Sequence, residues 1–185
     1  KGYYFSFFDF LKKMPETNFG KFVIFVSLIS FSLNISLPFF SVYLLQDLGF
    51  NYKVFTFITL SSSIAMILFF PLWGRFSDRY GNEKMLTITS FLIPISPVLW
   101  TLSKSPFYLI FPQIFLGIFL GGFALASNNF IYDSVKKDHR GLCVAYYSIL
   151  TGIGVFVGSL IGGLIINYIN FFNKFYFVFI LSAIL

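Results

Sequence analysis

Residues 74–84 read Gly74-Arg75-Phe76-Ser77-Asp78-Arg79-Tyr80-Gly81-Asn82-Glu83-Lys84, and they are almost the only place in the middle of the chain where charge is dense. On either side lies a charge-free apolar run, Val54–Gly74 before the segment and Met85–Ser103 after it. A helix needs about 20 apolar residues to cross roughly 30 Å of hydrocarbon. The charged segment is therefore predicted to be a short loop that joins two membrane-spanning helices.

The composition of the chain places it in the membrane class. Hydrophobic residues make up 57% of the 185 residues and charged residues 11%, and the mean hydropathy is +0.83. A soluble domain carries roughly 25% charged residues. With one cysteine, Cys143, and one histidine, His139, we expect no internal disulfide, no metal cluster and no cofactor. Because the chain begins at Lys1 and stops within an apolar run, we expect it to be a piece of a longer protein.

Six charge-free windows predict the membrane spans. The first four are long enough to cross, the fifth crosses and then turns near residues 168–173, and the sixth is a helix cut short by the end of the chain. Prolines inside these windows, including the four named below, are compatible with spanning helices, because neighbours and water satisfy the freed carbonyl groups. We therefore predict an all-α integral membrane protein, a six-helix bundle over residues 21–185 with a truncated sixth helix. The windows are Phe22–Gln46, Val54–Gly74, Met85–Ser103, Ser105–Tyr132, Gly141–Asn173 and Phe175–Leu185, and the prolines are Pro38, Pro94, Pro97 and Pro112.

Basic residues are distributed very unequally between the two sides of the predicted bundle. Four precede the first span, three lie between spans two and three, and three between spans four and five, which makes ten on one side against three on the other. Basic loops stay in the cytoplasm, so the N-terminal segment and the 74–84 loop of a multi-pass plasma-membrane protein are predicted to be cytoplasmic. We exclude nucleic acid as a partner, because no basic patch is interleaved with exposed aromatic residues. The ten are Lys1, Lys12, Lys13, Lys21, Arg75, Arg79, Lys84, Lys136, Lys137 and Arg140, and the three are Lys53, Lys104 and Lys174.

Residues 1–20 are predicted to form a cytoplasmic linker with an amphipathic helix that lies on the membrane surface. Polar residues recur there at helical spacing against a set of apolar residues, and Pro15 ends the pattern. A disordered linker is the alternative. The polar set is Ser6, Asp9, Lys12 and Lys13, and the apolar set is Phe5, Phe8, Leu11 and Met14.

The charged loop has the spacing G-x-x-x-D-R-x-G-x-x-K and follows the second span. This arrangement resembles the signature loop of the major facilitator superfamily, a large class of secondary transporters. The resemblance covers nearly the whole chain in span layout, and it implies one half of a twelve-helix fold built from two six-helix repeats. The partners that it implies are a small-molecule solute, the lipid bilayer and the other six-helix half of the same polypeptide.

In the resembling family this loop latches the cytoplasmic ends of helices from opposite halves. The latch residues carried over to this chain are Gly74, Asp78, Arg79, Gly81 and Lys84. Gly81 can take the positive φ of a tight turn, Gly74 can let another helix approach, and Asp78 can bond open N–H groups at a helix N-terminus. Arg79 and Lys84 can pair with carboxylates or carbonyls nearby. The alternative is a loop that only signals orientation.

Three features favour the C-terminal half of such a transporter. Gln113 stands where the N-terminal half of the family typically carries an Arg in span four. Ser159 stands where the drug-antiporter pattern of span five has a proline. The basic amphipathic segment before the first span is similar to the linker between the two halves.

Glycines at helical spacing predict close helix packing. Gly154, Gly158 and Gly162 lie at i, i+4 and i+8 in span five, and Gly117 and Gly121 lie at i and i+4 in span four. Small residues at this spacing let two helices pack backbone to backbone. They serve either as static packing faces or as surfaces that slide during transport.

No Asp, Glu, Lys, Arg or His lies within a membrane-depth window. If the full protein couples to protons, the coupling carboxylate is therefore expected in the missing half, and a facilitator without coupling is the alternative. Substrate contacts in this half are then expected to be polar but uncharged. In the resembling fold, spans one and four line the central cavity. Candidates are Asn34, Tyr43, Gln113, Asn128 and Asn129, with hydrogen bonding between helices as the alternative role.

The leading hypothesis is a transporter that moves a small organic solute by alternating access, of an efflux type or proton-coupled. A receptor or assembly protein that kept the fold without transport is the alternative. An integral membrane enzyme would need clustered nucleophiles and bases, and the segment Asp133–His139 lacks their spacing, so no enzyme is expected. Within that segment His139 is expected to be solvated, and Asp133 can pair with Lys136 or Lys137.

Overall fold

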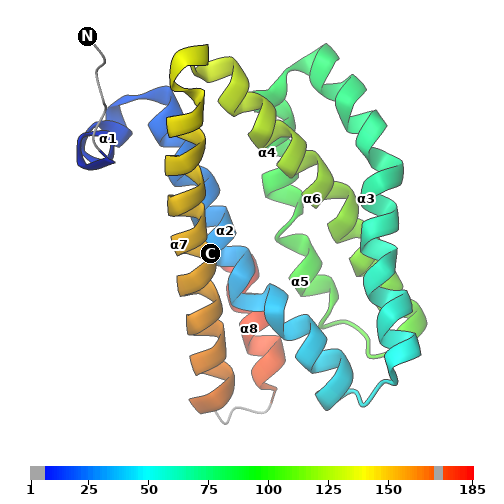
Figure 1. Ribbon diagram of the computed structural model, residues 1–185. Coiled ribbons are helices and arrows are strands. Elements are labelled where there is room, and N and C mark those ends of the chain that lie inside the picture. The colour runs from blue at the N-terminus through cyan, green and yellow to red at the C-terminus, as the bar shows by residue number, and fades with distance from the viewer. Residues whose placement is uncertain (1–6, 169–172) are drawn as a thin grey trace.

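The computed structural model describes residues 7–168 and 173–185, and every regular element in these residues is helical. Apolar sequence forms the middle of the long helices, and short segments connect them (Figure 1). The elements are α1 (Phe7–Lys13), η1 (Met14–Glu16), α2 (Asn18–Val42), η2 (Tyr43–Asp47), α3 (Tyr52–Tyr80), α4 (Asn82–Leu92), α5 (Ile95–Leu99), α6 (Pro106–Ser134), η3 (Lys137–His139), α7 (Arg140–Tyr168) and α8 (Lys174–Ile184). The charged segment 74–84, predicted to be a loop, is helical except at Gly81, because α3 continues to Tyr80 and α4 begins at Asn82.

The predicted all-α membrane bundle is confirmed. Four helical segments of the described residues are long and apolar enough to cross a membrane, and they correspond to predicted spans one, two, four and five. The first combines α2 with the π-helical turn η2, and the others are α3, α6 and α7 with its preceding turn. The sixth predicted span begins as the short apolar helix α8.

The third crossing differs from the continuous span predicted over Met85–Ser103, because it is broken into α4 and α5. Pro94 stands at the break and has no N–H to donate to the carbonyl group one turn earlier. A hydrogen bond joins the segment after this break to α6, since Ser96 Oγ donates to the Pro112 carbonyl at 3.2 Å. By contrast, Pro38 and Pro112 lie inside helices that continue past them.

Helices distant in sequence pair along their lengths. α2 packs along α7, α3 packs along α6, and α4 also lies against α6, while α8 contacts α2 and α5. Contacts between α2 and α6 are few, although these are spans one and four. Figure 1 shows that α1, the α3–α4 turn and η3 lie at one end of the bundle, which we call the basic end. The connections at residues 48–51 and 100–105 lie at the opposite end.

Helix α1 forms where the amphipathic helix is predicted, but it buries a different face. Phe10 is buried and stacks on Tyr146 of α7 with ring centroids 5.0 Å apart, and Phe7 contacts the same ring at 5.2 Å. Phe8, which was predicted to be on the apolar face, is 73% exposed. Tyr146, far away in sequence, determines which side of α1 turns inward, and Phe8 is left on the outer side, where the predicted membrane-facing residues would lie.

Helix α2 begins at Asn18, three residues before residue 21, where the half-domain is predicted to start. Thr17 caps α2, because its side-chain oxygen accepts a hydrogen bond from the Gly20 backbone N–H at 3.1 Å. Ser6 and Phe5 of the predicted amphipathic pattern lie outside the described residues.

Candidate functional site

The turn between α3 and α4 is built on Gly81. This residue has φ of +84°, a conformation that is strained for a residue with a Cβ atom. Its backbone N–H donates to the Ser77 carbonyl at 2.8 Å, which closes the last turn of α3. The next residue, Asn82, already belongs to α4. The chain thus reverses direction within a single residue, as the sequence predicts for this glycine.

A hydrogen-bonded cluster fixes this turn to α6, and Asn82 lies at its centre. The Asn82 amide nitrogen donates to Asp133 Oδ2 at 2.7 Å. The Asn82 amide oxygen accepts from the Ser77 hydroxyl and from the Asn129 amide nitrogen, the latter at 3.2 Å. One side chain therefore ties the ends of α3, α4 and α6 together at the basic end. We call Ser77, Asn82, Asn129 and Asp133 the asparagine cluster.

The cluster corrects one expectation, for Asp133, and gives Asn129 the alternative role, a hydrogen bond between helices. Asp133 makes no ion pair with Lys136 or Lys137 among the described residues, since its carboxylate faces the α3–α4 turn and bonds Asn82. Asn129, a predicted cavity residue, also bonds Asn82 at the end of the bundle. Asn82 itself was not predicted, because it occupies a position where the loop pattern accepts any residue.

The charged residues of the loop point outward from the bundle. Asp78, Arg79 and Lys84 are all exposed, and the Asp78 carboxylate makes no hydrogen bond or ion pair with any other described residue. The cations of Arg79 and Lys84 lie 5.1 and 5.3 Å from the centre of the Tyr80 ring. Both contacts are within the range of a cation–π interaction. At Gly74 a Cβ atom would meet no described atom within 4 Å.

Trp73, which precedes the loop, fastens α3 to the middle of α6. Its indole N–H donates to the Ile118 carbonyl at 2.7 Å. A Cβ atom at Gly122 would lie 2.7 Å from the indole ring, so only glycine leaves room for the ring at this distance. The sequence offers no periodic signal for this contact, because Trp73 and Ile118 are far apart in the chain.

The predicted packing glycines lie against neighbouring helices. On α7 a Cβ atom at Gly154, Gly158 or Gly162 would meet a backbone carbonyl oxygen of α2, and for Gly154 that distance is 2.6 Å. On α6 a Cβ atom at Gly117 would meet the Ser62 carbonyl oxygen of α3. The carbonyl partners of the three α7 glycines are Ser27, Phe31 and Ile35, in that order.

Gly121 on α6 faces a side chain. A Cβ atom there would lie 2.9 Å from Cγ of Met66, which is a flexible group and not backbone. Gly121 is therefore expected to accept an added methyl group more easily than the glycines whose Cβ atom would meet a backbone carbonyl oxygen.

The five predicted cavity residues do not come together in one place. Tyr43 is fully buried at the opposite end among Trp100, Phe175 and Phe179, and its hydroxyl donates to the Tyr176 hydroxyl at 3.3 Å. It is therefore a core residue here, because a ring surrounded by other rings offers no surface to a solute.

The remaining three candidates differ in their surroundings. Asn34 donates to the Ser30 carbonyl of its own helix at 2.8 Å, and Asn128 is exposed. Gln113 is 6% exposed and its amide makes no hydrogen bond with another described residue. Its amide atoms are not fully enclosed, so Gln113 stays a candidate for contact with an external ligand.

Comparison with known proteins agrees with this arrangement of helices and loop. The family model of the Major Facilitator Superfamily matches residues 22–185, and the chain belongs to this family. It is thus part of a multi-pass membrane protein.

Similar proteins include transporters from yeast and bacteria. An uncharacterized transporter of Schizosaccharomyces pombe is 33% identical over 60% of this chain and 19% of its own length. The multidrug export protein EmrB of Haemophilus influenzae is 23% identical over 67% of this chain and 24% of its own. The multi-drug resistance efflux pump PmrA of Streptococcus pneumoniae is 27% identical over 72% of this chain and 34% of its own. The chain thus matches from a fifth to a third of the length of these relatives.

Proposed function

We propose that the complete protein is a secondary transporter of the plasma membrane that exports a small organic solute by alternating access. In this proposal residues 1–185 are its C-terminal half. The observation that carries the proposal is the contrast within the 74–84 loop. The turn is held rigidly by Gly81 and Asn82, whereas the Asp78 carboxylate has no partner among the described residues.

A rigid turn that presents an unpaired carboxylate is suited to a contact with a second body. The other six-helix half supplies such a body, and the open N–H groups at the end of one of its helices would stabilise an anion. The open space at Gly74 would let that helix approach. Because the contact has to break in every cycle, its strength should be modest, on the order of 1–3 kcal/mol.

The assignment of this chain to the C-terminal half rests on two residues within the spans and on the segment that precedes the first span. Gln113 and Ser159 stand where the other half of the family carries Arg and Pro, and α1 with its basic residues precedes the first span. The efflux direction rests on two of the similar proteins, which are named as drug exporters. Gln113, Asn34 and Asn128 remain the proposed solute contacts, all of them uncharged.

The latch is tested by Asp78→Asn in the full-length protein. We expect the efflux of ethidium from cells to fall about tenfold, because the substitution removes the anion without adding volume. Asp138→Asn is the matched control, since Asp138 is another exposed carboxylate at the basic end, in η3. Equal rates for the two variants would contradict the latch. Efflux no faster than in cells without the protein would contradict an efflux transporter.

The orientation is tested with single cysteines in a Cys143→Ser background. Lys53 and Glu83 are exposed residues at opposite ends of the bundle. We expect Lys53→Cys to react with an impermeant thiol reagent in sealed cells and Glu83→Cys to react only after lysis, because the basic end is proposed to be cytoplasmic. The reverse pattern would overturn the orientation.

A further inference from the structure

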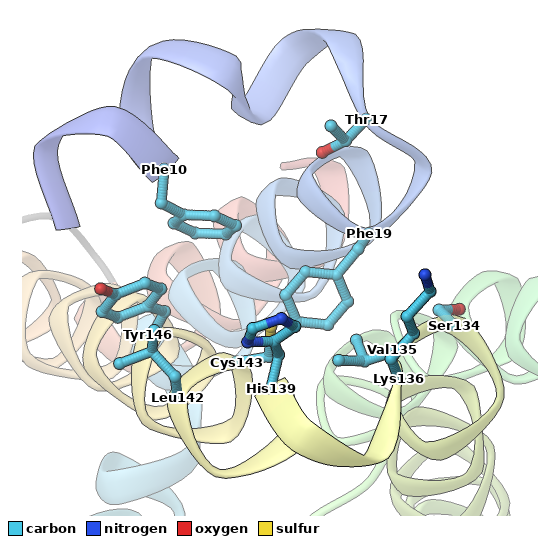
Figure 2. A pocket seen from close by; sticks show the side chains of 10 residues that line it. All are labelled: Phe10, Thr17, Phe19, Ser134, Val135, Lys136, His139, Leu142, Cys143 and Tyr146. Carbon is cyan, nitrogen blue, oxygen red and sulfur yellow. The ribbon is translucent and has the colours of Figure 1, made fainter. Parts of the chain in front are cut away.

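A cavity of about 340 Å³ lies beneath α1 at the basic end (Figure 2). Liquid water occupies roughly 30 Å³ per molecule, so the space is large enough for a sizeable part of an organic ligand. One wall comes from α1 and the start of α2, with Phe10 and Phe19, and the other from α7, with Leu142 and Tyr146. The α6–α7 connection closes the third side. These walls are mainly apolar carbon.

Two of the side chains that line this cavity, Lys136 and His139, are basic, which favours an anionic ligand. Figure 2 shows Lys136 and His139 rising from the α6–α7 connection toward the α1 side. Both side chains are exposed, and neither makes an ion pair with another described residue. No carboxylate among the described side chains, which do not include that of Asp9, lines the cavity. A neighbouring cavity at the start of α2 has the opposite character, because Glu16 and Glu83 line it.

An apolar slot with a cation and an imidazole at its rim matches an amphiphile that has an anionic head. The position of the cavity in the bundle limits further which amphiphile could bind there. The slot lies at the basic end, which holds nine basic residues of the described part of the chain, and Phe8 on the outer side of α1 is 73% exposed, as expected for a helix that rests on a bilayer. Basic residues at a membrane surface attract anionic lipids.

We propose that this cavity is a binding site for an anionic phospholipid. One acyl chain lies against Phe10, Phe19, Leu142 and Tyr146, and the phosphate contacts the Lys136 ammonium and an N–H of His139. The bound lipid then fills the space between α1 and the α6–α7 connection, so that α1 is held in place jointly by Tyr146 and by the membrane. The proposal does not depend on which solute the protein moves or on whether it moves one.

Photolabelling of the full-length protein in vesicles tests the site. The vesicles contain phosphatidylcholine and phosphatidylglycerol in equal parts and a trace of a lipid with a diazirine on one acyl chain. The probe has either a phosphoglycerol or a phosphocholine head, and labelled positions are identified by mass spectrometry. We expect labelling of the segments 10–19 and 142–146 to be about fivefold stronger from the phosphoglycerol probe, since charge recognition at the rim adds to the apolar contact.

Variants then separate the rim from the walls. The double variant Lys136→Gln/His139→Gln should lose the preference between the probes, whereas Lys53→Gln/Lys104→Gln, at the opposite end, should keep it. Leu142→Trp should reduce labelling from both probes, because the indole fills the slot. Each variant is first checked for a single species in size-exclusion chromatography.

The comparison of the two probes on the unaltered protein decides the outcome without any variant. Equal labelling from both probes would overturn the anionic specificity. No labelling of these segments, or a cross-link from the cavity to another segment of the protein, would overturn the lipid site.

Discussion

The two long helix pairs of this half, α2 with α7 and α3 with α6, both depend on glycine, but they use it differently. Along α7, three glycines meet three carbonyl oxygens of α2 in succession. Along α6, Gly117 meets a carbonyl oxygen of α3, while Gly121 and Gly122 meet the side chains of Met66 and Trp73. The α2–α7 pair is therefore in backbone contact over two turns, and the α3–α6 pair over a single position.

The two pairs also end differently at the basic end. Phe22 of α2 stacks on Tyr147 of α7 and on Phe130 of α6, with ring centroids 5.8 and 4.4 Å apart. The α3–α6 pair ends in the asparagine cluster, where Asn82 bonds Asp133 at 2.7 Å. Stacked rings have no single required geometry, whereas the amide and carboxylate groups bond only at defined distances and angles. We infer that α2–α7 is a fixed unit and that the position of α3 on α6 is held by bonds that can open.

The largest effect is expected from Gly158→Leu. The added side chain would have to displace the Phe31 carbonyl of α2, which is backbone and cannot change rotamer. Overpacking a well-packed site costs about 1–3 kcal/mol and more where the backbone has to move, so we expect little folded protein. Leu160→Ala is the control, since Leu160 is 50% exposed on the same helix. The measurement is the monodisperse fraction of full-length protein, and equal yields would mean that α7 does not depend on this contact.

Smaller substitutions compare the two helix pairs directly. Gly158→Ala should lower the free energy of unfolding by about 1–3 kcal/mol. Gly121→Ala should cost less than 1 kcal/mol, because the Met66 side chain can move away. At Gly163 the nearest described atom to an added Cβ would be Cζ of Phe39, at 3.6 Å, so alanine is expected to be neutral or to gain up to about 1 kcal/mol in helix propensity. Thermal unfolding in one detergent ranks the three, and an equal loss at Gly158 and Gly121 would remove the distinction between the pairs.

The effect expected at the asparagine cluster is smaller than the effect of Gly158→Leu. Asn82→Ala removes its hydrogen bonds to Ser77, Asn129 and Asp133 but creates no clash, so we expect a loss of about 1–2 kcal/mol. Thr87→Ala on the same helix is the control, because the Thr87 hydroxyl bonds only within α4. Thermal unfolding of the full-length protein measures both. A loss at Asn82 no greater than at Thr87 would show that the cluster does not hold α3 and α4 on α6.

Much of the fold could be predicted because hydrocarbon imposes a local rule. A helix that crosses the bilayer needs a charge-free run, so α2, α3, α6 and α7 coincide with predicted windows. The glycine spacing on α7 could be read in the same way, since periodicity is local. The identity of the partner helix could not, because α2 and α7 are separated by most of the chain.

The site was less predictable because its side chains act through distant partners. Gly81 has the positive φ expected of it, since the turn is local. Asn82 and Trp73 were missed, and Asn129 and Tyr43 were assigned to a cavity, because the same amide or phenol can bond a solute or a neighbouring helix. Only the three-dimensional arrangement separates these uses, as the bond from Asn129 to Asn82 illustrates.

The break between α4 and α5 has a consequence for how the protein is made. α4 has 11 residues and rises about 17 Å, and α5 has only five residues, so neither piece crosses the bilayer alone. Two hydrogen bonds join this segment to α6, from the Ser96 hydroxyl to the Pro112 carbonyl and from the Tyr108 hydroxyl to the Leu99 carbonyl, and both become available only after α6 has been synthesised. We therefore expect the translocation channel to retain this segment until α6 emerges from the ribosome, so that the two enter the bilayer as one helical hairpin.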